Sequence, residues 1–234
     1  MSQPVPSLPD FWDLRYSAGG GPLTRTLSQR IGALAAWTAG RAGLAPAAVT
    51  LTGASVFIAG AAAFAWLPAG WTWTVACAAA FQLAYGLDCA DGQLARATGR
   101  VSAFGAWLDL ACDHVRNAVL AGALAYWLAA TRALPLAGAM FIGVALMAGM
   151  SLKLHALAAL RAGGAGAVPQ PQDATRRIAS GVLDTPFFLL GFALLREAPP
   201  WLALYAGAMG LAYGAVGAAQ ALRHLSRGKG AGSA

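Results

Sequence analysis

Charged side chains are scarce in this sequence. Asp, Glu, Lys and Arg make up 11% of the 234 residues, whereas a soluble domain typically carries about 25%. So few charges cannot cover a water-facing surface, and 58% of the residues are hydrophobic. The composition therefore favours an all-α, polytopic integral membrane protein.

Cysteine is also rare. Cys77, Cys89 and Cys112 are odd in number and stand at no metal-ligand spacing. Each lies in or beside an apolar run, so we expect small buried hydrophobic side chains rather than metal ligands. A cleavable signal peptide is not evident, because Met1 to Pro9 is rich in proline and lacks an apolar core.

Long apolar runs predict six transmembrane helices. Each run is close to the roughly 20 residues that cross a hydrocarbon core. Turns rich in proline and glycine separate some of them, and tryptophans near their ends suit the interface between lipid and water. The predicted spans are residues 47–66, 71–90, 106–129, 135–158, 178–195 and 201–222, and the tryptophans are Trp66, Trp71, Trp73, Trp127 and Trp201.

The segment before the first span predicts an amphipathic helix. Leu23, Leu27, Ile31 and Leu34 recur at helical spacing, so the helix can lie in the headgroup layer. A soluble helix that packs on the membrane domain is the alternative. The expected organisation is a flexible N-terminal segment (1–22), the interfacial helix (23–43), a six-helix membrane domain (44–225) and a polar tail (226–234).

The basic residues predict an orientation. Thirteen of the sixteen lysines and arginines fall in the terminal segments and in the loops, including span ends, on the same predicted side. Arg132 and Arg196 fall on the opposite side, and Arg116 lies inside a span. Because positively charged loops stay in the cytoplasm, we expect a bacterial plasma-membrane protein whose termini and residues 88–113 face the cytoplasm. The net charge of +7 then fits attraction to anionic membrane lipids rather than to nucleic acid.

Carboxylates cluster beside or inside the second and third spans. Four of the nine acidic residues are Asp88, Asp91, Asp109 and Asp113. Spacings of three and four residues place each pair on one face of a helix. Carboxylates at membrane depth call for a compensating cation, and oxygen ligands suit Mg²⁺ or Mn²⁺. Two ions are the expected number, as in two-metal phosphoryl-transfer sites.

Small residues and an arginine share these helix faces. Gly92, Ala95 and Gly105 would let a ligand approach the backbone, and Arg96 offers a forked cation suited to phosphate. Helix packing explains small residues alone, and a proton relay or ion pathway explains a single carboxylate. Neither explains why all of these features share two faces.

The run Asp88-x2-Asp91-Gly92-x2-Ala95-Arg96-x8-Gly105-x3-Asp109-x3-Asp113 resembles the full signature of the CDP-alcohol phosphotransferase family. Upstream, Leu44 to Thr50 resembles the family's Thr-Pro-Asn-x-x-Thr motif before its first span, although Ala47 stands where asparagine is usual. The six-span pattern agrees with this resemblance along most of the chain.

The resemblance implies a reaction and a role for each matched position. An acceptor hydroxyl would attack the donor phosphorus distal to the cytidine, and CMP would leave. Asp88, Asp91 and Asp109 would ligate metal, and Asp113 would complete the metal site and act as the general base. The residues implied to line the CDP site are Gly92, Ala95, Arg96 and Gly105.

The acceptor site is less defined in the sequence. Arg116 follows Asp113 by about one helical turn, so it can face the same cavity or form a structural ion pair, for which Asp184 is a candidate. Lys153, His155 and Arg176 lie near the cytoplasmic ends of the fourth and fifth spans, where the resemblance loosely places ligands of an acceptor phosphate. The positive-inside rule explains such basic residues as well. For Asp184 a structural partner is the favoured role.

Three functions follow from these patterns. The leading one is Mg²⁺-dependent transfer of a phosphatidyl group from CDP-diacylglycerol, or another CDP-alcohol, to an alcohol in phospholipid biosynthesis. A CDP-polyol phosphate transferase is the second. A small cation-coupled transporter is the third, but residues 135–234 contain no repeat of the Asp/Gly pattern that an inverted half would show. A homodimer is compatible with each.

Overall fold

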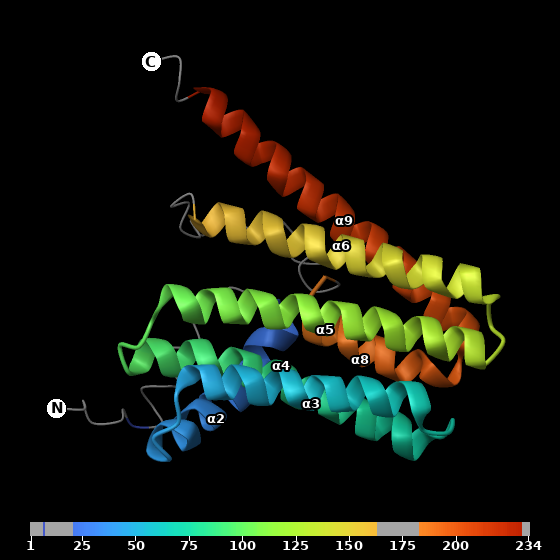
Figure 1. Cartoon of the computed structure of the whole chain (residues 1–234), viewed down its shortest axis with the longest axis horizontal. Coiled ribbons are helices and arrows are strands. Elements are labelled where there is room, and N and C mark those ends of the chain that lie inside the picture. The colour runs from blue at the N-terminus through green and yellow to red at the C-terminus, as the bar shows by residue number, and fades with distance from the viewer. Residues whose placement is uncertain (1–6, 8–20, 163–182, 231–234) are drawn as a thin grey trace.

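The computed structural model describes residue 7 and residues 21–162 and 183–230, and these residues are helical with short connecting turns (Figure 1). No strand occurs among them. The helices are η2 (Thr24–Ser28), α2 (Gln29–Arg41), α3 (Pro46–Trp66), α4 (Trp71–Ala97), α5 (Ala103–Ala130), α6 (Leu136–Ala162), α8 (Thr185–Leu194), η3 (Leu195–Glu197) and α9 (Pro199–Gly230).

The prediction of an all-helical membrane protein is confirmed. Within the described residues, three stretches are long and apolar enough to cross a membrane: Pro46–Trp66, Leu136–Ala158 and Pro199–Leu222. Helices α4 and α5 have 27 and 28 residues, which is sufficient length, but they carry the clustered carboxylates. Of the predicted fifth span only residues 183–195 lie within the described residues, and α8 there has ten residues. The count of six spans therefore stays a prediction.

Local signals fix where the helices begin. Pro46 opens α3 at its first position, where its missing N–H leaves no bond unmade. Gly70 adopts a φ of 151° in the turn before α4, a conformation that disfavours other residues. At the start of α5 the hydroxyl of Ser102 accepts a hydrogen bond from the N–H of Gly105 at 3.0 Å.

The helices pack in an order that brings α4 and α5 into the middle of the bundle. Helix α3 packs against α4 and α5, α5 also packs against α6, and α6 packs against α9. The shorter helices α2 and α8 both pack against α4 (Figure 1). Helix α2 and the C-terminal half of α9 lie at one end of the bundle, and the turn between α3 and α4 lies at the other.

Glycines allow the closest helix contacts. A Cβ atom on Gly149 of α6 would collide with the backbone of Gly210 on α9, and one on Gly210 would lie 2.9 Å from the Cα of Leu146. Likewise, a Cβ on Gly32 of α2 would lie 2.9 Å from the Cβ of Cys89 on α4. Such small residues at interfaces are typical of helices that associate in lipid.

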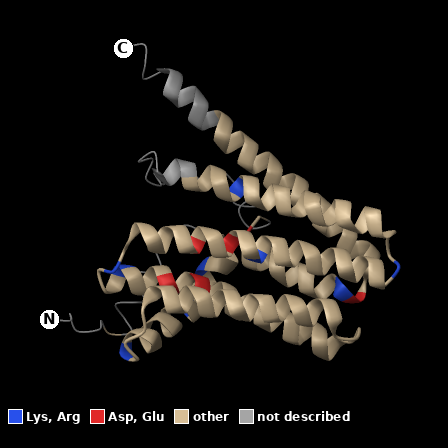
Figure 2. Ribbon diagram, viewed as in Figure 1, with Lys and Arg blue, Asp and Glu red and all other residues tan. Residues whose placement is uncertain are grey.

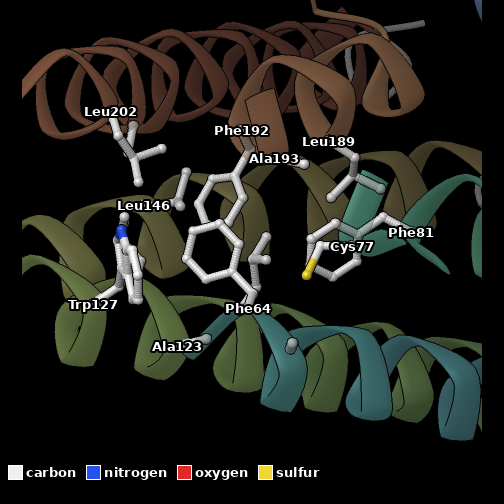
Figure 3. Close-up of a cluster of buried hydrophobic side chains, with 14 of the residues drawn as sticks. Phe64, Cys77, Phe81, Ala123, Trp127, Leu146, Leu189, Phe192, Ala193 and Leu202 are labelled. Atoms are coloured by element: carbon white, nitrogen blue, oxygen red, sulfur yellow. The ribbon is translucent and has the colours of Figure 1, made fainter. Parts of the chain in front are cut away.

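Aromatic side chains form the main core. The Phe64 ring of α3 lies between Phe192 of α8 and Trp127 of α5, with ring centroids 4.8 Å and 6.1 Å away (Figure 3). Trp127 is only 6% exposed, so it faces the inside of the bundle rather than lipid, and its interfacial depth stays a prediction. Its indole N–H donates to the carbonyl of Arg196 at 3.0 Å. The other four tryptophans of that prediction are exposed.

Large apolar side chains also cover the outside of the bundle. Phe141, Val144, Leu204 and Leu211 on α6 and α9 are all more than 60% exposed. A water-facing surface of this kind would favour aggregation, whereas lipid tails solvate it. Cys77 and Cys112 are buried and Cys89 is half-buried, and all three are free thiols, as expected for small hydrophobic residues.

The predicted N-terminal helix exists as η2 followed by α2. Its small residues face the bundle, with Gly32, Ala33 and Ala36 buried, while Leu27 and Leu34 are exposed. A helix that packs on the protein through small residues and keeps leucines outside suits an interfacial position. That position stays a prediction, as do the domain boundaries.

Candidate active site

Three of the four signature carboxylates converge. Asp88 and Asp91 lie one turn apart on α4, and Asp109 lies on α5. Each offers a carboxylate oxygen, and these three oxygens lie within 4.8 Å of one another. Three oxygen ligands at this separation fit a hard divalent cation such as Mg²⁺ or Mn²⁺.

The fourth carboxylate is held by an arginine. The Nη2 atom of Arg116 lies 2.6 Å from Oδ1 of Asp113 and 2.5 Å from Oδ1 of Asp88. The Arg116 side chain is 6% exposed, whereas those of Asp88 and Asp113 are 20% and 30% exposed. The suggested ion pair between Arg116 and Asp184 is therefore wrong, because the α5 helix turns Arg116 toward the α4 carboxylates.

Thr50 of α3 supports the cluster. Its hydroxyl donates to Oδ2 of Asp91 at 2.5 Å, and Asp91 is buried. This bond fixes the carboxylate that is least accessible to water. Sequence reasoning assigned no role to Thr50, although the Leu44 to Thr50 match ends on it. That match was the signal that could have identified it.

Of the residues expected to line the CDP site, Gly92 directly follows Asp91, and Ala95 and Arg96 lie about one turn further along α4. A Cβ atom on Gly92 would be 3.1 Å from Nη1 of Arg96, so the guanidinium group lies directly over this glycine. Arg96 is exposed at the end of α4, and Ala95 is half-buried beside it. Gly105 lies across the turn between α4 and α5, in the first turn of α5.

The charged residues are divided between two regions of the bundle. Figure 2 shows acidic segments gathered on α4 and α5 in the half nearer α2. At the opposite end lie Arg196 and Glu197, which pair with each other at 3.4 Å. The arrangement leaves a largely apolar middle section between the two regions.

The acceptor candidates do not form one cluster. The ammonium group of Lys153 donates to the carbonyl of Leu183 at 3.2 Å and lies 4.3 Å from the centre of the Tyr213 ring. The His155 ring of α6 is 4.7 Å from the ring of His114 on α5, the residue next to Asp113. Arg176 lies outside the described residues, and Arg116 belongs to the carboxylate cluster.

Asp184 has the structural partner that was favoured for it. One of its carboxylate oxygens accepts from the N–H of Thr24 at 2.9 Å, and the other accepts from the Thr24 hydroxyl. Both residues are buried. The contact ties η2 to the start of α8 across 160 residues of sequence, a separation that no local pattern reveals.

The model of the CDP-alcohol phosphatidyltransferase family matches residues 43–216. The chain belongs to this family. The resemblance read from the signature is thereby confirmed, and with it the assignment to a family of phosphatidyltransferase enzymes.

Two relatives of the chain carry the same name. The chain is 31% identical over 175 residues to the phosphatidylinositol phosphate synthase of Mycolicibacterium smegmatis. This match covers 74% of this chain and 77% of that protein. It is 38% identical over 89 residues to the phosphatidylinositol phosphate synthase of Mycobacterium marinum, but this match spans only 36% of that protein.

A solved structure has the same fold. The crystal structure of Mycobacterium tuberculosis phosphatidylinositol phosphate synthase with CDP-DAG bound superimposes with a TM-score of 0.57. The match covers 79% of this chain and 88% of that one, at 22% identity. At this identity the similarity shows the arrangement of helices and leaves the substrates of this chain open.

Proposed function

We propose that this protein transfers a phosphatidyl group from CDP-diacylglycerol to the hydroxyl group of a phosphorylated polyol, with release of CMP. The convergence of Asp88, Asp91 and Asp109 beside an exposed Arg96 carries the proposal. The relatives named phosphatidylinositol phosphate synthases support an acceptor of the inositol phosphate class. The related structure with CDP-DAG bound supports the donor.

The donor site follows from the ends of α4 and α5. Gly92, Ala95 and Gly105 add little side-chain bulk there, and the Arg96 guanidinium group that lies over Gly92 would move aside to face the cytidine diphosphate. The Arg96 guanidinium group can donate two parallel hydrogen bonds to a phosphate. Asp88, Asp91 and Asp109 would hold a divalent ion, which would supply positive charge to neutralise the diphosphate and the departing CMP.

The proton transfer is assigned to Asp113. Its Oδ1 is engaged by Arg116 at 2.6 Å, so Oδ2 is the oxygen that takes the proton of the acceptor hydroxyl. The acceptor oxygen then bonds to the phosphorus that carries the diacylglycerol. The bond from that phosphorus to the bridging oxygen breaks, and both of its electrons leave with CMP.

The acceptor phosphate is proposed to lie on the α6 side of Asp113. His155 is exposed there and close to His114, and Lys153 lies two residues before it. Arg176 completes this proposed set. Recognition of a phosphate by several weak cationic contacts would explain why Lys153 and His155 share no tight cluster.

The membrane position is part of the proposal. Six spans would place α2, the carboxylate cluster and the C-terminal half of α9 at the cytoplasmic face of a bacterial plasma membrane. The positive-inside distribution supports this orientation. The amphiphilic donor and the soluble acceptor would then meet at the same interface.

A panel of acceptors tests the proposed function. Purified protein in lipid nanodiscs with Mg²⁺ and CDP-diacylglycerol should release CMP with inositol phosphate and form a new phospholipid. Inositol, glycerol phosphate and serine should react at least tenfold more slowly. Turnover with serine or inositol as the best acceptor would contradict the phosphorylated-polyol assignment, and turnover with none of them would contradict the phosphatidyl transfer proposed here.

A further inference from the structure

A single nitrogen atom of Arg116 bridges the two helices of the signature. Its Nη2 lies 2.5 Å from Asp88 on α4 and 2.6 Å from Asp113 on α5. Since the arginine side chain is 6% exposed, water does little to screen its charge. The guanidinium group therefore stands in the position of a cation that joins both carboxylates.

This bridge divides the four carboxylates into two groups. Asp88, Asp91 and Asp109 keep one oxygen each within 4.8 Å of the others, whereas Asp113 is linked to them through Arg116. Mg²⁺ binds oxygens at about 2.0–2.1 Å, and paired ions lie about 3.5–4 Å apart. An ion that bridged Oδ1 of Asp88 and Oδ1 of Asp113 would have to occupy the place of Nη2.

Charge reinforces the steric conflict. An ion bound by the three-carboxylate group would share Asp88 with the guanidinium group, so the two positive charges would lie close together. A second divalent ion would add repulsion from the first ion and from Arg116, in surroundings where burial strengthens such interactions. Arginine keeps its charge at every accessible pH, so it does not yield this position by deprotonation.

We propose that Arg116 takes the place of the second divalent cation in this protein. The chain then binds one divalent ion, at Asp88, Asp91 and Asp109, and the guanidinium group supplies the second positive charge. This inference rests on the proposed function, because it concerns the same site. It replaces the expectation of two ions and assigns Arg116 to charge compensation within the site rather than to the acceptor phosphate.

A count of bound Mn²⁺ tests the inference without turnover. Electron paramagnetic resonance measures free Mn²⁺ in a titration of the purified protein, with no substrate present. The wild type should saturate at one ion per chain, with the spectrum of an isolated ion. Arg116→Ala should bind twice as many ions, with the spin coupling expected of neighbouring ions. Arg41→Gln removes an exposed arginine elsewhere and should keep the count at one.

The outcomes separate this inference from the proposed function. Two coupled ions in the wild type would overturn the role of Arg116 and leave metal-dependent transfer standing. An unchanged count of one in folded Arg116→Ala would also overturn it. Absence of any bound ion in the wild type would overturn the metal-dependent function together with this inference. If Arg116→Ala does not fold, Arg116→Gln, an uncharged variant with a longer side chain than alanine, provides the same comparison.

Discussion

Replacement of Arg196 by methionine should destabilise the protein strongly, although this residue is far from the carboxylates. Its side chain is fully buried at the end of the bundle opposite α2. It donates from Nε to the carbonyl of Phe64 at 3.0 Å, from Nη1 to that of Pro68 at 3.1 Å and from Nη2 to that of Leu67. These carbonyls belong to the last turn of α3 and the residues after it, where carbonyl groups have no N–H partner within the helix.

The expected loss can be estimated from these contacts. A hydrogen bond to a charged group contributes about 1.5–3 kcal/mol, and Arg196 also stacks 3.8 Å from the centre of the Trp127 ring. Water can reach part of the turn once the side chain is gone, so the loss is about 3–5 kcal/mol, as for other buried charged networks. For a chain of this size that lowers Tm by on the order of 10 °C.

Thermal unfolding in lipid nanodiscs measures this loss. Arg132→Asn is the matched control, because it removes an exposed arginine in the turn between α5 and α6 and asparagine tolerates its φ of 57°. The control should change Tm by less than 2 °C. Arg196→Lys should fall between the two, since an ammonium group cannot reach three carbonyls in a fork. A Tm of Arg196→Met within 2 °C of the wild type would refute the reasoning.

Four further predictions concern other parts of the chain. Burial raises the pKa of Glu197, but hydrogen bonds from Thr74 and the Gly70 N–H, together with Arg196, outweigh it and lower the pKa below its ordinary value of 4.5. The ionised Glu197 therefore stabilises the fold fully above about pH 5, and this stabilisation is lost as the pH falls through the pKa of Glu197 in the folded protein. The free energy of unfolding of Glu197→Gln should then depend less on pH between about pH 5 and 3 than that of the wild type. An equal pH dependence in the two proteins would count against this prediction. Asp113→Asn should reduce turnover at least 100-fold with little loss of Mn²⁺ binding, and a binding loss that accounts for the whole rate loss would make Asp113 a metal ligand instead. With the native cysteines replaced, a cysteine at position 69 should react with an impermeant thiol reagent from outside the cell while one in the C-terminal tail should not, and the reverse pattern would invert the topology. Gly149→Leu should lower Tm by several degrees because it separates α6 from α9, whereas Gly122→Leu, where a Cβ meets no atom within 4 Å, should not; equal effects would show that the close contact contributes nothing.

Periodic features of the sequence predicted most of the helices. Helices α3, α4, α6 and α9 begin within about two residues of the predicted spans, because a run of apolar residues and a proline or glycine turn are local signals. The predicted second span stops at residue 90, whereas α4 continues through the motif to Ala97, because hydropathy falls where the motif brings in polar residues. The contact of Trp127 with the buried Arg196 was not predicted, because stacking on a residue far along the chain cannot be read from sequence position.

The sequence predicted those features of the candidate site that depend on spacing along a single helix. Spacing along α4 and α5 placed the carboxylates on two faces, and the structure brings three of them together. The spacing of Asp113 and Arg116 allows an ion pair within one turn of α5. That Arg116 also reaches Asp88 depends on how α4 and α5 face each other, which spacing along one helix does not determine. The link between Thr24 and Asp184 depends in the same way on tertiary packing.

One labelling measurement tests the central claim most directly. CDP-diacylglycerol carrying radioactive phosphorus next to the diacylglycerol is incubated with Mg²⁺, inositol phosphate and either the wild type or Asp109→Asn. The account predicts that with the wild type all transferred label appears in the new phospholipid and none in CMP, and that Asp109→Asn, although folded, transfers at least 1000-fold less. Label in the nucleotide product, or wild-type transfer by Asp109→Asn, would contradict the claim that this carboxylate cluster catalyses phosphatidyl transfer.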